Sequence, residues 1–291
     1  MPRLGRGRNY SPIRKLIESV LRRAYALDWP ARVAPRMSVR RVDVSLELQG
    51  LRGEPRLTLG FASDLHAGPT TPQRTLEEAF GHLRAFDPDV LLLGGDFVLF
   101  DARYCERLVP LIRSVRAPLG RYAVLGNHDV WADDRRIERT LESAGVQLLV
   151  NRTVRLPGRE VSLGGLDDYW TGEPCYQEAF RDRSRVHLLL MHSPDHAPHL
   201  PREQRFDLAL CGHTHGGQIS LPSGRPIAMV SATSRRYPFG RFELSQGPML
   251  VSRGVGNIEV PMRAFAAPDV LCVRLTPPVV CATRAHRNGP D

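Results

Sequence analysis

Five short blocks of the chain place side chains that can bind metal ions in or beside tight loops. Their residues are Asp64-Leu65-His66, Gly95-Asp96, Gly126-Asn127-His128-Asp129, His192 and Gly212-His213-Thr214-His215. The blocks offer carboxylates, a carboxamide and imidazoles. This mixture suits divalent Mn, Fe or Zn better than Mg or Ca, which prefer all-oxygen ligands. The residue types therefore predict a centre that holds two divalent metal ions.

The chemistry of such a centre follows from the two cations. Two divalent ions about 3.5–4 Å apart can share one carboxylate and one water molecule, and the shared water becomes a hydroxide nucleophile near neutral pH. The cations also neutralise the charge that develops on a phosphoryl group under attack. The leaving group still needs a proton, which a nearby histidine that binds no metal ion can supply. The pattern thus predicts hydrolysis of a phosphoester bond by a metal-bridging hydroxide.

Each block follows an apolar run that is typical of a buried strand. The predicted strands span 56–62, 89–93, 122–125, 186–191 and 208–211. In open α/β sheets, ligands bind at the carboxyl ends of the strands, so blocks that are far apart in the chain can converge on one edge. Glycines in the blocks, such as Gly95 and Gly126, allow the backbone to turn tightly beside the site.

Helices are predicted between these strands, over 75–86, 104–115 and 133–144. Pro110 lies inside the second helix and is expected to kink or interrupt it, and Gly145 is expected to end the third. Further strands are predicted over 42–48, 146–150, 153–156 and 161–163, with short strands and turns over 249–275. This alternation of strands and helices predicts the α/β class.

Composition favours one catalytic domain. The hydrophobic fraction of 42% is sufficient for a full core. The five cysteines are odd in number and form no CxxC pair, which argues against a disulfide framework and favours a reducing compartment such as the cytoplasm. We expect a catalytic domain over 42–278, an N-terminal extension over 1–41 and a flexible tail over 279–291.

The extension carries the charge of the chain. Residues 1–41 hold eleven basic and two acidic residues, which accounts for the whole formal net charge of +9. A basic amphipathic helix is predicted over 11–27, and no apolar run is long enough for a signal peptide or a membrane-spanning helix. Two interpretations remain open: the helix lies on an anionic membrane surface, or it packs on the catalytic domain or on a partner.

The order and spacing of the five blocks resemble the calcineurin-like metallophosphoesterase superfamily, whose pattern is DxH, GD, GNH, H and GHxH. The resemblance covers residues 56–275 and implies a four-layer α-β-β-α sandwich of two mixed sheets flanked by helices. It also implies two ligand sets and one bridging carboxylate: Asp64, His66 and His215 for the first metal ion, Asp96 between the two, and Asn127, His192 and His213 for the second. His128 would bind no metal ion and would protonate the leaving group.

Further motifs narrow the resemblance to a bacterial branch of membrane-associated phosphodiesterases and UDP-2,3-diacylglucosamine pyrophosphatases. They span 165–168, 192–195, 212–218 and 251–256. A lipid- or nucleotide-linked substrate at the inner face of the cell membrane is expected, because the basic helix over 11–27 could hold the enzyme where such substrates lie. A nuclease or cyclic-nucleotide phosphodiesterase is the alternative, although the neutral charge of residues 42–291 argues against nucleic acid. A non-catalytic scaffold is a third reading, against which the complete ligand set argues.

Several polar residues outside the ligand set are also candidates for a role. Asp129 is expected to support the loop of His128, and Asp167-Asp168 to cap a loop or line a channel. Arg121, Arg253 and Tyr237 are candidate contacts to the phosphate or the substrate.

Overall fold

The computed structural model describes residues 20, 23–24, 37–229 and 231–278. The predicted amphipathic helix over 11–27 lies outside these residues except at three positions, and the tail over 279–291 lies outside them entirely. The predicted division of the chain at residues 41 and 278 stays a prediction. Within the described part, no helix is long and apolar enough to cross a membrane.

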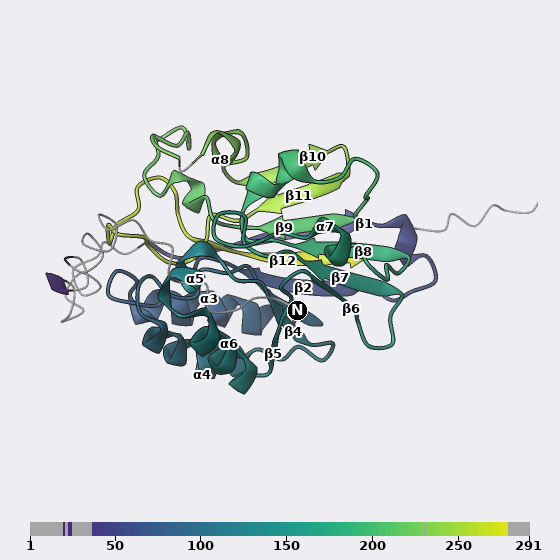
Figure 1. Cartoon of the computed structure of the whole chain (residues 1–291), viewed down its shortest axis with the longest axis horizontal. Coiled ribbons are helices and arrows are strands. Elements are labelled where there is room, and N and C mark those ends of the chain that lie inside the picture. Colours follow the sequence, from purple (N-terminus) through teal and green to yellow (C-terminus); the bar gives the residue numbers. More distant parts are fainter. Residues whose placement is uncertain (1–19, 21–22, 25–36, 230, 279–291) are drawn as a thin grey trace, which may run out of the picture.

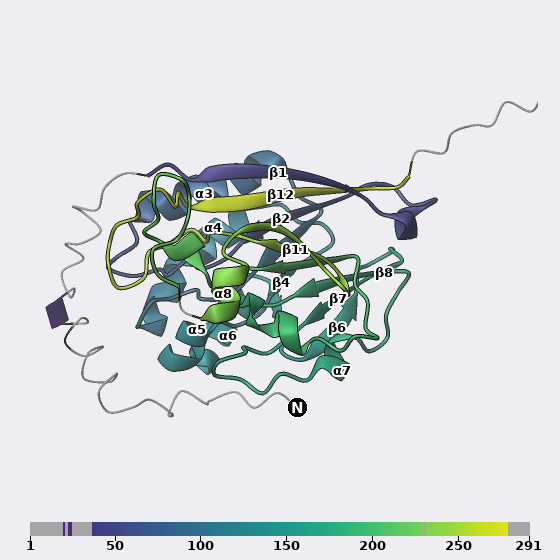
Figure 2. The ribbon, with the colours of Figure 1, turned by 90° about the horizontal axis from the view of Figure 1, so that it is seen from above.

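The first of two six-stranded sheets contains the strands that precede three of the ligand blocks. Its order is β1 (Arg40–Glu47), β12 (Asp269–Thr276), β2 (Leu57–Ala62), β3 (Val90–Leu93), β4 (Arg121–Ala123) and β5 (Val146–Leu148). All neighbouring strands are parallel except β12 and β2. The last strand of the described part, β12, therefore lies inside the sheet, between β1 and β2 (Figure 2).

The second sheet contains the strands that precede the other two blocks. Its order is β10 (Gly240–Leu244), β11 (Gly247–Val251), β9 (Leu208–Cys211), β8 (Val186–Leu190), β7 (Val161–Gly165) and β6 (Arg152–Arg155). The edge strands β10 and β6 are antiparallel to their neighbours, and the four strands between them are parallel. Both sheets are thus mixed, as the sequence resemblance implies.

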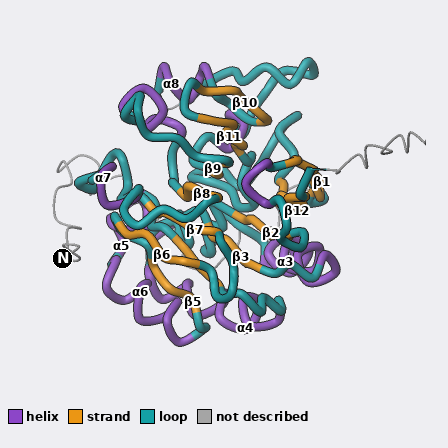
Figure 3. The backbone as a smooth tube through the Cα atoms, turned by 90° about the vertical axis from the view of Figure 1, so that its right-hand side faces the viewer, coloured by secondary structure: helices purple, strands orange, loops and turns teal. Residues whose placement is uncertain are grey.

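The two sheets pack face to face, and helices cover their outer sides (Figures 1 and 3). In β3, Val90 and Leu92 face the core between the sheets, while Leu91 and Leu93 face the helices. The helices on that side are α3 (Gln73–Phe86), α4 (Val109–Ser114) and α6 (Asp134–Ser143). The second sheet has a thinner cover of short segments, which include α7 (Tyr176–Ala179), α8 (Ala232–Arg236) and a 3-10 helix over Pro194–His199. The predicted four-layer α-β-β-α sandwich is confirmed.

Two helix boundaries follow directly from local sequence. The helix predicted over 104–115 is interrupted: a 3-10 helix over Ala102–Leu108 precedes α4, and Pro110 lies in the first turn of α4. Proline fits there because the first turn needs no N–H donor. The side chain of Asp133 accepts a hydrogen bond from Arg136 N and so caps α6. The short helix α5 (Asn127–Ala132) was not predicted, since its first residues read as a ligand loop.

Candidate metal centre

All five ligand blocks lie just past the carboxyl ends of parallel strands, as predicted. Asp64, Asp96 and Asn127 follow β2, β3 and β4 of the first sheet. His192 and His213 follow β8 and β9 of the second. The backbone N–H of His213 donates to both carboxylate oxygens of Asp64 at 3.0 Å, which joins the edges of the two sheets. The structure therefore brings the predicted ligands together at one edge shared by both sheets.

The backbone at this edge is strained. Ten non-glycine residues of the described part have positive φ, and half of them are predicted ligands, namely Asp64, His66, Asp96, His213 and His215, with φ between 41° and 69°. Such left-handed conformations cost roughly 1–3 kcal/mol each for a non-glycine residue and cluster at functional sites. The fold therefore stores strain where the ligand side chains must point inward.

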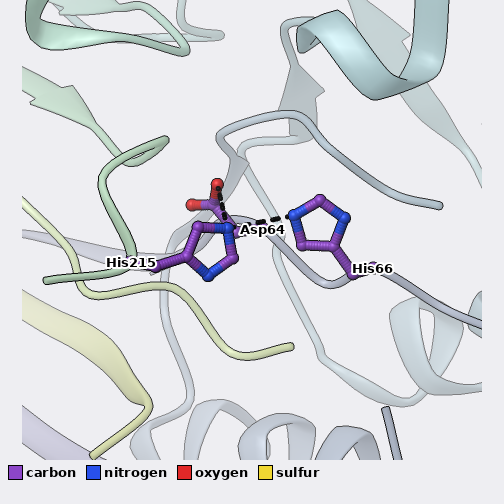
Figure 4. A group of neighbouring side chains, drawn as sticks. All are labelled: Asp64, His66 and His215. Atoms are coloured by element: carbon purple, nitrogen blue, oxygen red, sulfur yellow. Dashed lines mark hydrogen bonds and ion pairs between the residues drawn. The ribbon is translucent and has the colours of Figure 1, made fainter. Parts of the chain in front are cut away.

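The first group of ligand atoms comes from Asp64, His66 and His215 (Figure 4). The Nε2 atoms of the two imidazoles lie 3.0 Å apart, and Nε2 of His215 lies 3.4 Å from Oδ1 of Asp64. A 3-10 helix over His215–Gly217 begins at the last of these residues. Three ligand atoms thus converge on one point from both sheets.

The second group comes from Asp96, His192 and His213. Nε2 of His192 lies 3.4 Å from Oδ2 of Asp96 and 3.0 Å from Nδ1 of His213. Nδ1 of His192 donates to the carbonyl of Gly94 at 2.8 Å, which orients Nε2 toward the other ligand atoms. Oδ1 of Asn127 is buried without a hydrogen-bond partner in the described structure, as an oxygen that awaits a cation would be.

One oxygen of Asp96 faces both groups. Oδ2 lies 3.5 Å from Nε2 of His66 in the first group and 3.4 Å from Nε2 of His192 in the second. The other oxygen, Oδ1, accepts a hydrogen bond from His128 N at 2.9 Å. A side chain at Gly126 would place its Cβ only 2.2 Å from this Oδ1, so glycine is required there. Oδ2 therefore lies within reach of both groups of ligand atoms, and its role as a bridge between two metal ions stays a prediction.

The protonation states also fit divalent cations. Burial lowers the pKa of His66 and of His213 to about 3, so both rings are neutral at pH 7 and keep a lone pair. Burial raises the pKa of Asp96, but His192 and His128 outweigh it and hold that pKa well below its usual range. Burial lowers the pKa of His192, but Asp96 outweighs it and holds that pKa well above its usual range, so a metal ion that binds Nε2 would displace a proton. The centre therefore attracts positive charge at the point where the ligand atoms meet.

Asp129 holds two ligand loops in place. Its Oδ2 accepts hydrogen bonds from the backbone N–H groups of Asp96, at 2.8 Å, and Gly126, at 2.9 Å. Its Oδ1 accepts from Phe97 N at 2.7 Å and, more weakly, from Val98 N at 3.4 Å. The carboxylate thus ties the loop after β3 to the loop after β4, in keeping with the support role expected for it.

We expect Asp129→Ala to destabilise the fold by about 3 kcal/mol or more, because it leaves buried N–H donors without an acceptor. Affinity for Mn should fall by about 10- to 100-fold, since the two ligand loops lose the hydrogen bonds that hold them together. Urea unfolding and calorimetric titration measure the two effects. The control is Asp133→Ala, which removes only the cap of α6 and should cost about 1 kcal/mol without changing metal affinity. Equal effects of the two variants would contradict this role.

A buried arginine that the sequence did not suggest lies behind the first group. Nη2 of Arg263 lies 3.0 Å from Nδ1 of His215, and its Nη1 donates to the carbonyls of Arg253 and Ala266 at 2.9 and 3.1 Å. Burial lowers the pKa of Arg263 to about 10, so the guanidinium remains charged at pH 7. Arg263 fixes the ring of His215 and the loop around it. Neither spacing nor a motif could have indicated this role.

A pocket of about 430 Å³ opens beside the ligand groups. Its walls come from the centre itself and from several loops: Asp96, Asn127, His128, Trp131, Trp170, His213, Thr214, His215, Gly217, Gln218, Ala228, Met229, Ile258 and Glu259. Nε1 of Trp170 donates a hydrogen bond to Oδ2 of Asp195 at 2.9 Å. The indole ring is tilted relative to the ring of His213, and the two ring centroids lie 6.1 Å apart. The aromatic walls are therefore held by specific contacts.

The three residues suggested as substrate contacts do not line this pocket. Nη2 of Arg121 donates to the carbonyl of Val115, Arg253 pairs with Asp269 at 3.1 Å, and Tyr237 packs against Phe242. The expectation for Asp168 fits better, because its Oδ2 accepts from the backbone of Trp170 and Thr171 and so caps their loop.

His128 lines the same pocket from the start of α5. Its Nδ1 donates to the carbonyl of Leu99 at 2.8 Å, and its ring meets that of Trp131 edge-on at 4.8 Å. It lies close enough to His66 and Asp96 for the three to form a further metal-capable group. Its role as the histidine that binds no metal ion stays a prediction.

Comparison with known proteins agrees with this geometry. Residues 57–217 match the family described as calcineurin-like phosphoesterase. The phosphodiesterase YaeI of Escherichia coli is 34% identical over 226 residues, which cover 74% of this chain and 80% of that protein. The uncharacterized metallophosphoesterase YkuE of Bacillus subtilis is 29% identical over 216 residues, or 72% of this chain and 75% of that protein. A solved dimetal phosphatase from Danio rerio aligns with a TM-score of 0.47 and 11% identity, over 69% of this chain and 88% of that one.

The centre and the family match together define a metal-dependent phosphoester hydrolase. The chain belongs to the calcineurin-like metallophosphoesterase family, whose members use two divalent metal ions. The predicted cofactor class and enzyme class are thereby confirmed.

Proposed function

We propose that the protein hydrolyses a phosphodiester or pyrophosphate bond in a lipid- or nucleotide-linked substrate, such as UDP-2,3-diacylglucosamine. The composition of the pocket wall supports this. None of its lining residues in the described part is Lys or Arg, whereas Trp131, Trp170, Met229 and Ile258 supply apolar surface. A phosphodiester carries one negative charge and a second organic group, which an apolar wall can bind. A phosphomonoester carries more charge and would meet no basic side chain there.

Each group of the chain has a part in the proposed reaction. When bound, two divalent ions (Mn, Fe or Zn) supply an acidified water as nucleophile and neutralise the phosphoryl oxygens. Asp64, His66 and His215 would hold one ion, and Asn127, His192 and His213 the other, with Asp96 between them. His128 would protonate the departing oxygen from the pocket side. Trp131 and Trp170 would position the organic part of the substrate.

The test is hydrolysis by the purified chain loaded in turn with Mn, Fe and Zn. We expect bis-p-nitrophenyl phosphate to be favoured over p-nitrophenyl phosphate by about tenfold or more in kcat/KM, since the second charge of the monoester lacks a partner. A chelator should remove the activity. A preference for the monoester would contradict the proposal. A panel of UDP-diacylglucosamine, glycerophosphodiesters and cyclic nucleotides then separates the substrate classes.

One observation favours a second candidate, a nuclease or cyclic-nucleotide phosphodiesterase. Trp131 and Trp170 line the same pocket, and tryptophan rings are platforms on which nucleobases stack. Turnover of cyclic nucleotides or single-stranded DNA, without turnover of lipid-linked diesters, would support this candidate.

We infer a place for the enzyme at the inner face of the cell membrane. The basic segment over 1–41 supports this, because anionic head groups attract Lys and Arg at about 1 kcal/mol per residue. The four cysteines in the described part are all free thiols, in keeping with a reducing compartment.

A further inference from the structure

Two neighbouring loops, over 218–229 and 258–267, expose an unusual amount of apolar surface. Seven large apolar side chains are exposed in the described part, and five of them lie on these loops: Leu221, Ile227, Val260, Met262 and Phe265, each 40–60% exposed. We call these five the apolar rim. Exposed apolar side chains that gather on neighbouring loops indicate a site of interaction.

Backbone and side-chain hydrogen bonds join the two loops into one surface. Ser220 N donates to the carbonyl of Ala264 at 2.8 Å, and Ala264 N donates to the carbonyl of Gln218 at 3.0 Å. The side chain of Gln218 donates to the carbonyl of Val260 and accepts from Ile258 N, both at 2.9 Å. The loops project together from one end of the molecule (Figures 1 and 2, left). The rim is therefore held as a unit.

The conformation of Phe265 sets it apart from an ordinary exposed side chain. Its φ is +54°, a value that is strained for a bulky residue, and its side chain is 60% exposed. The folded chain thus keeps an aromatic ring outward at a cost in backbone energy, without burying it in return. Such strain is typical of functional positions.

The rim lies at the mouth of the catalytic pocket. Its two loops also supply Gln218, Ala228, Met229, Ile258 and Glu259 to the pocket wall. A surface that binds the rim therefore lies beside the opening of the pocket.

Positive charge accompanies the rim. Arg225 is exposed between Leu221 and Ile227. The basic segment over 1–41 joins the body at the end of the second loop, where Arg40 N donates to the carbonyl of Pro268 at 2.8 Å. Apolar side chains flanked by arginine are the combination that binds the head-group region of an anionic bilayer.

We propose that the apolar rim inserts into the surface of an anionic lipid bilayer and thereby turns the pocket mouth toward the lipid. This adds a second contact to the basic segment, and it sets the orientation of the enzyme, which a charged segment alone does not. The proposal extends the proposed function but does not depend on it, because binding to vesicles is measured without a substrate.

The experiment uses the full chain and vesicles of phosphatidylcholine with or without phosphatidylglycerol. Ile227→Ser/Val260→Ser/Phe265→Ser should bind anionic vesicles about tenfold or more weakly than the unaltered chain in a sedimentation assay. Its hydrolysis of bis-p-nitrophenyl phosphate in vesicle-free buffer should be unchanged, which shows that it is folded. Arg225→Gln should weaken binding, whereas the control Arg155→Gln, an equally exposed arginine on β6 at the far edge of the second sheet, should not.

Direct insertion has its own measurement. In Phe265→Trp, the added fluorescence should shift to the blue on anionic vesicles and be quenched by brominated lipid. Full vesicle binding by the triple Ser variant would overturn the proposal and leave the basic segment as the whole contact. A dimer that dissociates in the triple variant, with no vesicle binding, would also overturn it and identify a second copy of the chain as the occupant.

Discussion

Asp96→Ala is expected to abolish turnover and to empty both metal sites. Oδ2 of Asp96 is the one carboxylate oxygen that faces His66 of the first group and His192 of the second, so its removal takes a ligand from each ion. Since the metal ions supply several kcal/mol of transition-state stabilisation, kcat/KM for bis-p-nitrophenyl phosphate should fall by at least about 10³-fold. Elemental analysis of the purified variant should find less than one metal ion per chain.

The control for this variant is Asp207→Ala. Oδ2 of Asp207 accepts a hydrogen bond from His187 N at 2.8 Å. Asp207 directly precedes β9, whereas His213 follows the other end of this strand. Loss of that bond should cost about 1 kcal/mol of stability, with metal content and turnover retained. Full activity of purified Asp96→Ala would refute the two-metal mechanism, because Oδ2 of Asp96 is the predicted bridge between the two groups.

His128→Ala is expected to lose turnover while keeping both metal ions. If His128 acts only as the proton donor, the loss should depend on the leaving group. The leaving group of a glycerophosphodiester is a basic alkoxide, which needs a proton. This substrate should therefore react roughly 10²- to 10⁴-fold more slowly in the variant. The leaving group of a nitrophenyl ester is a stable nitrophenolate anion, so its rate of hydrolysis should fall much less. The ratio of kcat/KM for the two substrates, before and after substitution, measures this difference.

The matched control is His82→Ala. Each ring forms a hydrogen bond with one backbone carbonyl: His128 with that of Leu99 at 2.8 Å, and His82 with that of Val39 at 3.1 Å. His82, however, lies on α3 and does not line the pocket. His82→Ala should therefore retain turnover of both substrates. Loss of one metal ion in His128→Ala would contradict the assigned role and make His128 a ligand together with His66 and Asp96.

The main strands and the convergence of the candidate ligands at their ends could be predicted because their signals are local. An apolar run followed by a glycine-containing turn and an Asp or His indicates both a strand and the side chain at its end, as at Asp96 and His213. Parallel pairing then brings these ends to one edge without further information. The four-layer fold follows from the same alternation and from the family match.

The pocket walls could not be predicted, because contacts between distant residues set them. Trp170 is held by Asp195, and the loop of Ile258 is held by Gln218, and neither pairing leaves a mark in the spacing of the sequence. Arg121 and Arg253 looked like phosphate contacts by type alone, but a carbonyl and Asp269 hold them elsewhere. The helix α5 was missed because its first turn is made of residues whose types indicated a loop.

The position of β12 has a consequence for how the protein is made. This strand lies between β1 and β2, yet it is the last strand of the described part and follows every predicted ligand residue in the sequence. Until it arrives, β2 has an open edge, and the loop of Asp64 at its end lacks a neighbour on one side. Long-range pairing of this kind is slow, and an open edge can pair with other chains. Ordering of the metal centre therefore depends on the pairing of β12, and a truncated chain that carries all the predicted ligands but lacks this strand should fail to form the centre.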